Sequence, residues 1–343
     1  MDPHLTAAGV TVRVAANVLP VVAFLVALIV FDSYKLVRSP RVAAGILAGV
    51  VVALAAMPVN RGFLAALSWE RAQYSLLAGP AVEEILKGSC LVFLIARKRV
   101  GFMVDAAIYG FALGTGFAIV ENLYYLGALD DSSVAVSVLR GFGTALMHGG
   151  ATALFGIATK MLLERYGFAR AWVYLPGLAL AVGLHAIYNA LLFAPGIAVL
   201  AVVVLLPVLM RALFRRGDRT LREWLGVGFD TDAELLDMIS CGEVSLSGIG
   251  AYLSSLREHF PPEVVADMCN LLRIRLELSL RAKGILLARE AGLEVAPSPE
   301  VREAFDELSY LERSIGRTGL LAMRPLLHWR EQDLWELHML GRT

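Results

Sequence analysis

The chain has 343 residues, of which 57% are hydrophobic, and its mean hydropathy is +0.65. This composition excludes an ordinary soluble globular protein, whose apolar fraction is much lower. The net charge is zero, but residues 1–216 contain 17 basic and 10 acidic side chains, whereas residues 217–343 contain 14 and 21. A basic apolar part followed by an acidic part gives no sign of a nucleic-acid surface, and we expect no nucleic-acid partner.

Seven apolar segments follow one another along the first part of the chain. Each approaches or exceeds the roughly 20 residues that a helix needs to cross a bilayer. Their predicted bounds are 12–31, 42–58, 74–96, 102–126, 134–162, 171–194 and 196–214. We therefore predict an all-α, polytopic membrane helix bundle with about seven transmembrane helices over residues 1–216.

Basic residues are distributed unequally between the connecting loops. Loops 32–41, 97–101 and 160–170 each contain three Lys or Arg residues, whereas loop 127–133 contains only acids. Loops rich in Lys and Arg remain in the cytoplasm. We therefore expect a multi-pass protein of the cell membrane, inner or plasma, with its N-terminus outside and its C-terminus in the cytoplasm.

Residues 217–343 have the polar, helical periodicity of a small soluble domain. Helices are predicted at 232–240, 247–259, 262–291, 299–316 and 328–340. We predict a helical cytoplasmic C-terminal domain, and we find no catalytic motif in it. Regulation, or recruitment of a cytoplasmic protein partner, is the role expected for this domain.

Ionisable residues occur within four of the apolar segments. Such residues cost about 2.5–3.5 kcal/mol each at mid-membrane on insertion scales, so they normally face the bundle interior and pair. They are Glu83, Glu84 and Lys87 in the third segment, Glu121 in the fourth, His148 in the fifth, and His185, accompanied by Asn189, in the sixth. At 1.5 Å per residue the four groups fall roughly 8–21 Å below the outer surface. We expect them to meet in one pocket.

The local spacing of these residues suggests how they are arranged. Glu83 and Lys87 are four residues apart and can pair along one helix face. Glu83 and Glu84 are adjacent and point roughly 100° apart, so one is expected to face the pocket while the other orients a neighbour. His185 and Asn189 are again four apart and share a face.

Carboxylates and imidazoles gathered in a membrane pocket indicate hydrolysis. Two histidines and a carboxylate match a three-ligand catalytic zinc site with one position open. A further glutamate can then take the proton of a water. A metal-free arrangement also fits, in which a glutamate activates water while His185 and Asn189 stabilise the oxyanion.

The four groups, in this order, resemble the PrsW family of intramembrane proteases. That family shows EExxK, FAxxE and two later histidine motifs in successive membrane helices. The corresponding stretches here are EEILK at 83–87, FAIVE at 117–121, LMHGGATALFG around His148 and HAIYN from His185. The resemblance covers about residues 74–194. PrsW proteins are distantly similar to the CAAX-prenyl protease and bacteriocin-processing superfamily, whose second motif carries histidine where Glu121 stands.

The resemblance implies a bacterial membrane protease, which in some members makes the first cut in an anti-sigma factor. We therefore expect hydrolysis of a peptide bond in a membrane-anchored protein substrate. Glu83 or Glu84 is the expected general base, with Lys87 tuning the glutamates and Asn189 supporting the oxyanion. The expected metal ligands are Glu121, His148 and His185, with Zn²⁺ as the metal. In the metal-free alternative, these three groups polarise the substrate carbonyl directly.

Two other functions are compatible with parts of the sequence. Chains of carboxylates and histidines also serve as proton relays in transporters, although no inverted repeat relates the two halves of this chain. A membrane sensor or scaffold acting through residues 217–343 is the second alternative. Deletion of residues 217–343 distinguishes the two hypotheses: a protease should still cleave its substrate, whereas a scaffold should fail.

Overall fold

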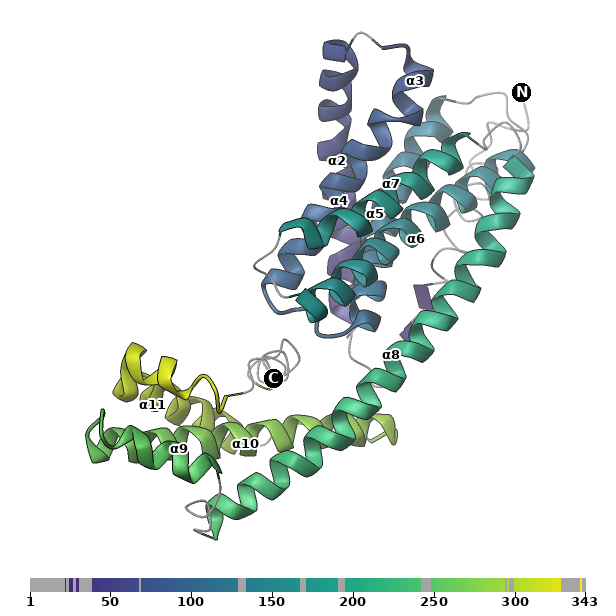
Figure 1. The fold of residues 1–343 in the computed structure, drawn as a ribbon. Helices are drawn as coiled ribbons and strands as arrows, with labels where there is room; N and C mark the ends of the chain where they lie inside the picture. The colour runs from purple at the N-terminus through teal and green to yellow at the C-terminus, as the bar shows by residue number, and fades with distance from the viewer. Residues whose placement is uncertain are drawn as a thin grey trace. The chain divides into compact units, whose positions relative to one another are not determined.

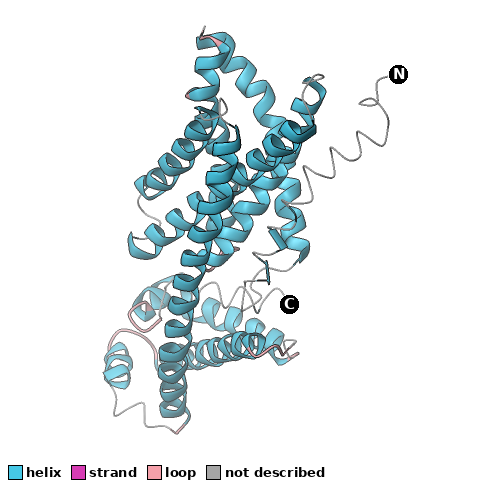
Figure 2. Ribbon diagram, turned by 90° about the vertical axis from the view of Figure 1, so that its right-hand side faces the viewer, coloured by secondary structure: helices cyan, strands magenta, loops and turns pink. Residues whose placement is uncertain are grey.

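The computed structural model describes residues 39–67, 69–128, 134–166, 171–190, 195–241, 248–293 and 299–327, with a few isolated positions. Every regular element in these ranges is a helix, as Figure 1 and Figure 2 show, and the all-α prediction is confirmed. The predicted segment at 12–31 and the predicted helix at 328–340 lie almost wholly outside the described residues. The chain divides into two compact units, Met1–Gly217 and Asp218–Thr343.

The first unit is a bundle of long helices. In chain order its helices are α2 Ser39–Leu67, α3 Arg71–Leu76, α4 Ala78–Ala96, α5 Met103–Ala128, α6 Val134–Tyr166, the 3₁₀ turn η2 Ala171–Tyr174, α7 Leu175–Ala190 and the beginning of α8, Pro195–Ser240. Among the described residues, four stretches are long and apolar enough to cross a membrane: Ser39–Leu67, Met103–Tyr124, Gly141–Tyr166 and Ala171–Ala190. The count of seven transmembrane helices stays a prediction.

Helix α4 is absent from those four stretches because of its own side chains. Three ionisable residues, Glu83, Glu84 and Lys87, lie within its 19 residues. Glu84 and Lys87 are nevertheless buried. A polar helix of this kind is stable in an apolar bundle only where its charges find partners inside the protein.

Helix α5 is the centre of the bundle and packs most extensively against α6 and α2. The close packing depends on glycine. A Cβ on Gly114 would lie 2.3 Å from the carbonyl oxygen of His148 on α6, and a Cβ on Gly49 would lie 2.0 Å from that of Leu113. Small residues let helix backbones approach in this way. The backbone carrying His148 is thereby held directly against α5.

The predicted segment 74–96 is two helices rather than one. Pro80 has no N–H to donate to the carbonyl of Leu76, and its ring would clash with that carbonyl in a continuous helix. The backbone turns at Leu77, whose φ is −119° and ψ −65°, and α4 begins at Ala78 with Pro80 in its first turn. The axis of the short helix α3 therefore need not continue that of α4.

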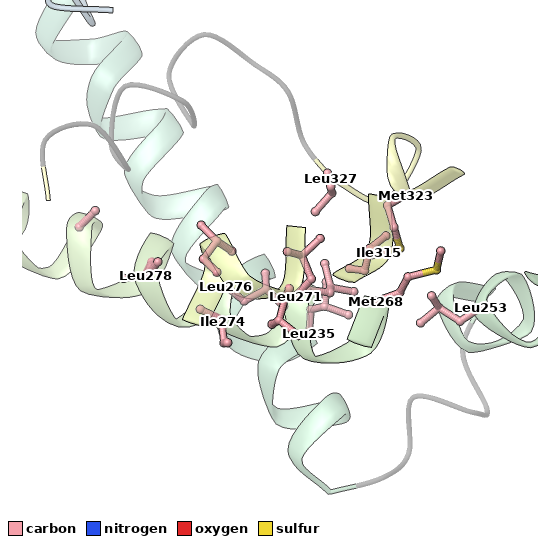
Figure 3. Close-up of a cluster of buried hydrophobic side chains, with 14 of the residues drawn as sticks. Leu235, Leu253, Met268, Leu271, Ile274, Leu276, Leu278, Ile315, Met323 and Leu327 are labelled. Carbon is pink, nitrogen blue, oxygen red and sulfur yellow. The ribbon is translucent and has the colours of Figure 1, made fainter. Parts of the chain in front are cut away.

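The second unit is a small helical domain with its own apolar core. It contains the end of α8, α9 Gly248–Leu256, α10 Pro262–Glu290 and α11 Glu300–Met323. Figure 3 shows the core, in which Leu271 and Met268 of α10 meet Leu235 of α8, Leu253 of α9 and Ile315 of α11. Pro262 occupies the first turn of α10, where its missing N–H costs nothing.

Three helix ends differ from the sequence prediction. Helix α2 continues to Leu67, nine residues past the predicted end at 58. Helix α8 includes residues 215–231, which were expected to separate two helices. The polarity of the sequence changes there, but the backbone hydrogen bonds of a helix do not depend on hydropathy. In α11 the backbone leaves helical geometry at Gly316, with φ 68° and ψ 173°, where the predicted helix 299–316 ends, but helical structure resumes and continues to Met323. Glycine accepts this left-handed φ without the strain of a Cβ.

Candidate active site

Glu84 of α4 is the hub of a buried polar cluster in the first unit. Its Oε1 accepts hydrogen bonds from Lys87 Nζ at 2.5 Å and from His185 Nδ1 at 2.9 Å. The side chain of Glu84 is 1% exposed and that of Lys87 is fully buried. A buried cation and anion in contact satisfy one another where water cannot. The ion pair joins residues three apart, so Lys87 contacts Glu84 and not the predicted Glu83.

His148 of α6 lies between Lys87 and Glu121. Its Nδ1 is 2.8 Å from Lys87 Nζ, and its Nε2 is 2.5 Å from Glu121 Oε2. Because an ammonium group only donates, Nδ1 is the acceptor, and the ring proton on Nε2 points to the Glu121 carboxylate. Helix α5 thus supplies the carboxylate that orients the imidazole of α6.

His185 of α7 has a different pair of neighbours. Its Nδ1 bonds to Glu84, and its Nε2 faces Glu83 Oε2 at 4.0 Å. The rings of His185 and His148 meet edge to face, with centroids 4.7 Å apart. With Nδ1–H donated to Glu84, the lone pair of His185 is on Nε2, the nitrogen that faces Glu83.

Phe117 of α5 covers one side of the cluster. Lys87 Nζ lies 4.6 Å from the centre of its ring, and the His148 ring centre lies 5.0 Å away. The face of an aromatic ring attracts a desolvated cation and excludes water. The first residue of the FAIVE stretch therefore shields Lys87, while the last, Glu121, contacts His148.

Glu83 of α4 is held at one oxygen only. Its Oε1 accepts a hydrogen bond from Asn60 Nδ2 at 3.0 Å. Its Oε2 is buried and has no hydrogen-bond partner among the described residues. A buried carboxylate oxygen without a donor is costly unless a cation or a ligand engages it.

Three of these residues form a set of donors that suits a divalent metal. One ligand atom each from Glu83, His148 and His185 lie within 4.8 Å of one another. Two histidines and one glutamate are a known ligand set of catalytic zinc. Glu84 accepts a hydrogen bond from Nδ1 of His185, the nitrogen on the far side of the ring from Glu83, as carboxylates behind metal-binding histidines do. His185 Nε2 and the unpartnered oxygen of Glu83 fit such an ion directly. His148 fits through Nε2 once that nitrogen gives up the proton it directs to Glu121, because its Nδ1 accepts from Lys87.

The family model for PrsW family intramembrane metalloproteases matches residues 39–212, which is just over half of the chain. The chain belongs to the PrsW family. The match includes α2 to α7 and therefore every residue of the cluster. This PrsW protein is accordingly a membrane protein and an intramembrane protease. No curated protein and no solved structure matches the chain.

The bundle brings together six of the seven site residues predicted from the sequence. They are Glu83, Glu84, Lys87, Glu121, His148 and His185. Asn189 makes its hydrogen bond elsewhere, from Nδ2 to the backbone carbonyl of Ser75 on α3 at 2.8 Å. The role of Asn189 at an oxyanion stays a prediction.

Two residues in the hydrogen-bond chain to Glu83 were not identified from the sequence. Asn60 of α2 binds Glu83, and Tyr74 of α3 binds Asn60. A polar Asn near the end of an apolar helix was the only available sign. Helix α2 contains none of the four motifs. Nothing in the sequence therefore linked Asn60 to Glu83 of α4.

Proposed function

We propose that this PrsW family protein hydrolyses a peptide bond in or beside the membrane segment of an anchored substrate protein, with Zn²⁺ as its metal. The observation that carries the proposal is the convergence of Glu83, His148 and His185 around one point, with a carboxylate behind His185. The family match favours the protease over the transporter and the sensor.

The ligand set that the geometry supports is Glu83, His148 and His185. A divalent metal bound by these groups supplies Lewis-acid activation of the substrate carbonyl. Glu84 holds the Nδ1 proton of His185 and keeps its Nε2 available. The sequence had placed Glu121 in the ligand set instead of Glu83, and both sets share the two histidines.

We assign proton transfer to Glu121. Its side chain is 23% exposed, compared with 15% for Glu83 and 1% for Glu84, so a water reaches it most easily. Glu121 takes a proton from the water that attacks the carbonyl carbon. It returns the proton to the amide nitrogen as the C–N bond breaks. This assignment exchanges the roles expected of Glu121 and Glu83.

Lys87 keeps the cluster in its working charge state. Its ammonium group lies between Glu84 Oε1 and His148 Nδ1 and is shielded by Phe117. A buried cation in contact with an anion satisfies both charges where water cannot. Lys87 thus holds the charges in place and does not touch the substrate.

Metal content and cleavage measured on the same samples test these roles. We would assay four purified proteins: the parent chain, Glu83→Gln, Glu121→Gln and His185→Ala. Each is tested for bound zinc and for cleavage of a panel of tagged membrane proteins that have a single span. We expect Glu83→Gln and His185→Ala to lose both zinc and cleavage. Glu121→Gln should keep its zinc and cleave 10²- to 10⁴-fold more slowly, the usual contribution of a general base.

The matched control is Glu70→Gln, since Glu70 is an exposed residue just before α3. It should behave as the parent chain in both assays. Removal of zinc by a chelator should abolish cleavage, and added Zn²⁺ should restore it. Parent-like cleavage by Glu83→Gln and His185→Ala would end the proposal, and cleavage by a chelated sample would support the metal-free alternative.

The proposal extends to topology and partners. The positive loops support an N-terminus outside and a C-terminus in the cytoplasm, with residues 1–216 as the transmembrane protease domain in the cell membrane. Residues 217–343 would then be a cytoplasmic helical domain that binds a protein partner. The resemblance of the motifs to the PrsW family supports an anti-sigma factor, cut first by this enzyme, as the substrate class.

A further inference from the structure

A chain of two hydrogen bonds connects Glu83 to two helices outside the four motifs. Tyr74 OH of α3 donates to Asn60 Oδ1 at 2.8 Å, and Asn60 Nδ2 of α2 donates to Glu83 Oε1 at 3.0 Å. Tyr74 is 6% exposed. The end of this chain is the carboxylate whose second oxygen, Oε2, faces His185 Nε2.

The chemistry of the three groups requires that the hydrogen bonds be donated from Tyr74 to Asn60 and from Asn60 to Glu83. The ionised Glu83 carboxylate can only accept, so the amide of Asn60 must turn its NH₂ toward it. The carbonyl oxygen of Asn60 then faces Tyr74 and can only accept, so the phenol must donate. Each bond polarises the next, which strengthens the hold on Oε1. Oε2 remains the oxygen available to the cluster.

The position of Tyr74 is itself set by its surroundings. Gly79, in the first turn of α4, lies against it: a Cβ there would be 3.2 Å from the Tyr74 carbonyl oxygen and 3.4 Å from its ring. Asn189 of α7 donates to the carbonyl of the next residue, Ser75. Helix α3 is thus fixed to both α4 and α7, and its tyrosine reaches α2.

We propose that Asn60 and Tyr74 are positioning residues for Glu83. They anchor Oε1 and so aim Oε2 at the point where His148 and His185 converge. The inference rests on the proposed function, because it assumes that Glu83 acts in the cluster. It holds whether Glu83 binds the metal or takes the proton, since either role requires one fixed oxygen.

The test compares Asn60→Leu, Tyr74→Phe and Glu83→Gln in the full-length protein. Asn60→Leu keeps the volume and removes the hydrogen bonds, and Tyr74→Phe removes only the hydroxyl. Zn²⁺ affinity is measured by competition with a chromophoric chelator, and kcat and KM by cleavage of the tagged membrane protein panel. We expect Asn60→Leu to reduce zinc affinity or kcat by 10- to 100-fold, the usual effect of partners behind metal ligands, with KM unchanged. Tyr74→Phe should have a smaller effect in the same direction.

A double variant separates positioning from general loss of structure. In a Glu83→Asp background, which keeps a carboxylate ligand but moves it out of reach of Asn60, Asn60→Leu should lower the remaining zinc affinity no further. A merely structural role would give an additional loss. Tyr109→Phe is the matched control, since Tyr109 is a buried tyrosine of α5 that bonds to Arg41 instead of the cluster.

The outcomes distinguish this inference from the proposed function. If Glu83→Gln loses zinc or cleavage while Asn60→Leu and Tyr74→Phe match the parent, the positioning role is wrong and the proposed function stands. If Glu83→Gln also matches the parent, the proposed function and the positioning role both fail. Losses in Asn60→Leu that persist unchanged in the Glu83→Asp background would overturn positioning as well.

Discussion

Glu84 and His185 are 101 residues apart in the sequence, yet Glu84 Oε1 and His185 Nδ1 are joined by a 2.9 Å hydrogen bond. The same oxygen also receives the ammonium group of Lys87. A single buried carboxylate therefore sets the tautomer of one histidine and balances the charge of one lysine. These two functions make the stability and the chemistry of the bundle depend on the same atom.

Replacement of Glu84 by Gln should destabilise the bundle strongly. The change leaves Lys87 buried without a counter-charge, and the loss of one partner of a buried ion pair costs about 3–5 kcal/mol. We expect a lower midpoint of thermal unfolding in detergent. The double variant Glu84→Gln with Lys87→Met should recover much of the stability but no cleavage. A parent-like midpoint for Glu84→Gln alone would contradict this account of the ion pair.

Replacement of Gly114 by Ala should disturb the site from a distance. Its Cβ would lie 2.3 Å from the His148 carbonyl oxygen, so α5 and α6 must separate and His148 must move away from Glu121. We expect at least a 10-fold loss of cleavage and a lower unfolding midpoint. Gly183→Ala on α7 is the control, because a Cβ there meets nothing within 4 Å. Alanine favours a helix by about 1 kcal/mol over glycine, so the control should be neutral or slightly stabilised. Equal behaviour of the two variants would refute the packing argument.

Replacement of Lys283 by Met should loosen the second unit locally. Lys283 Nζ bonds to Asp232 Oδ2 at 2.5 Å, with the lysine side chain 3% exposed and the aspartate 14% exposed. Removal of the cation leaves the Asp232 carboxylate with Ser279 Oγ as a donor. We expect the local free energy of unfolding to fall by about 3 kcal/mol. Hydrogen exchange of α10 peptides in the full chain measures it. Arg281→Met is the control, since its pair with Glu300 is exposed and such pairs contribute about 0–1 kcal/mol. Similar exchange in both variants would count against the prediction.

The two cysteines of the second unit should react at different rates. Burial raises the pKa of the Cys269 thiol above its ordinary value of 9.0, with the Arg257 charge acting weakly in the opposite direction. A raised pKa means less thiolate at any pH below it, and the thiolate is the nucleophile. In a Cys90→Ser background, maleimide should therefore label the exposed Cys241 faster than Cys269 at pH 7.5. Labelling of Cys269 should keep rising above pH 9. Equal rates at pH 7.5, measured by peptide mass spectrometry, would contradict the prediction.

The sequence by itself was sufficient for the helical class, the positions of most helices and six residues of the polar cluster. Hydrophobic runs and their lengths are local properties, and they located α5, α6 and α7 to within a few residues, whereas they placed the end of α2 nine residues too early. The cost of placing Glu84, Lys87 or His148 in an apolar segment is also local, so their presence alone indicated a shared interior pocket.

The tertiary structure decided how those residues pair and which others join them. The pairing of Lys87 with Glu84, the selection of Glu83 with the two histidines and the arrival of Asn60 and Tyr74 all depend on how each helix is rotated about its axis. That rotation is set by contacts between helices, such as Gly114 against His148, and by the break at Pro80 that releases α3. Because these contacts join residues far apart in the chain, no local pattern in the sequence contains them.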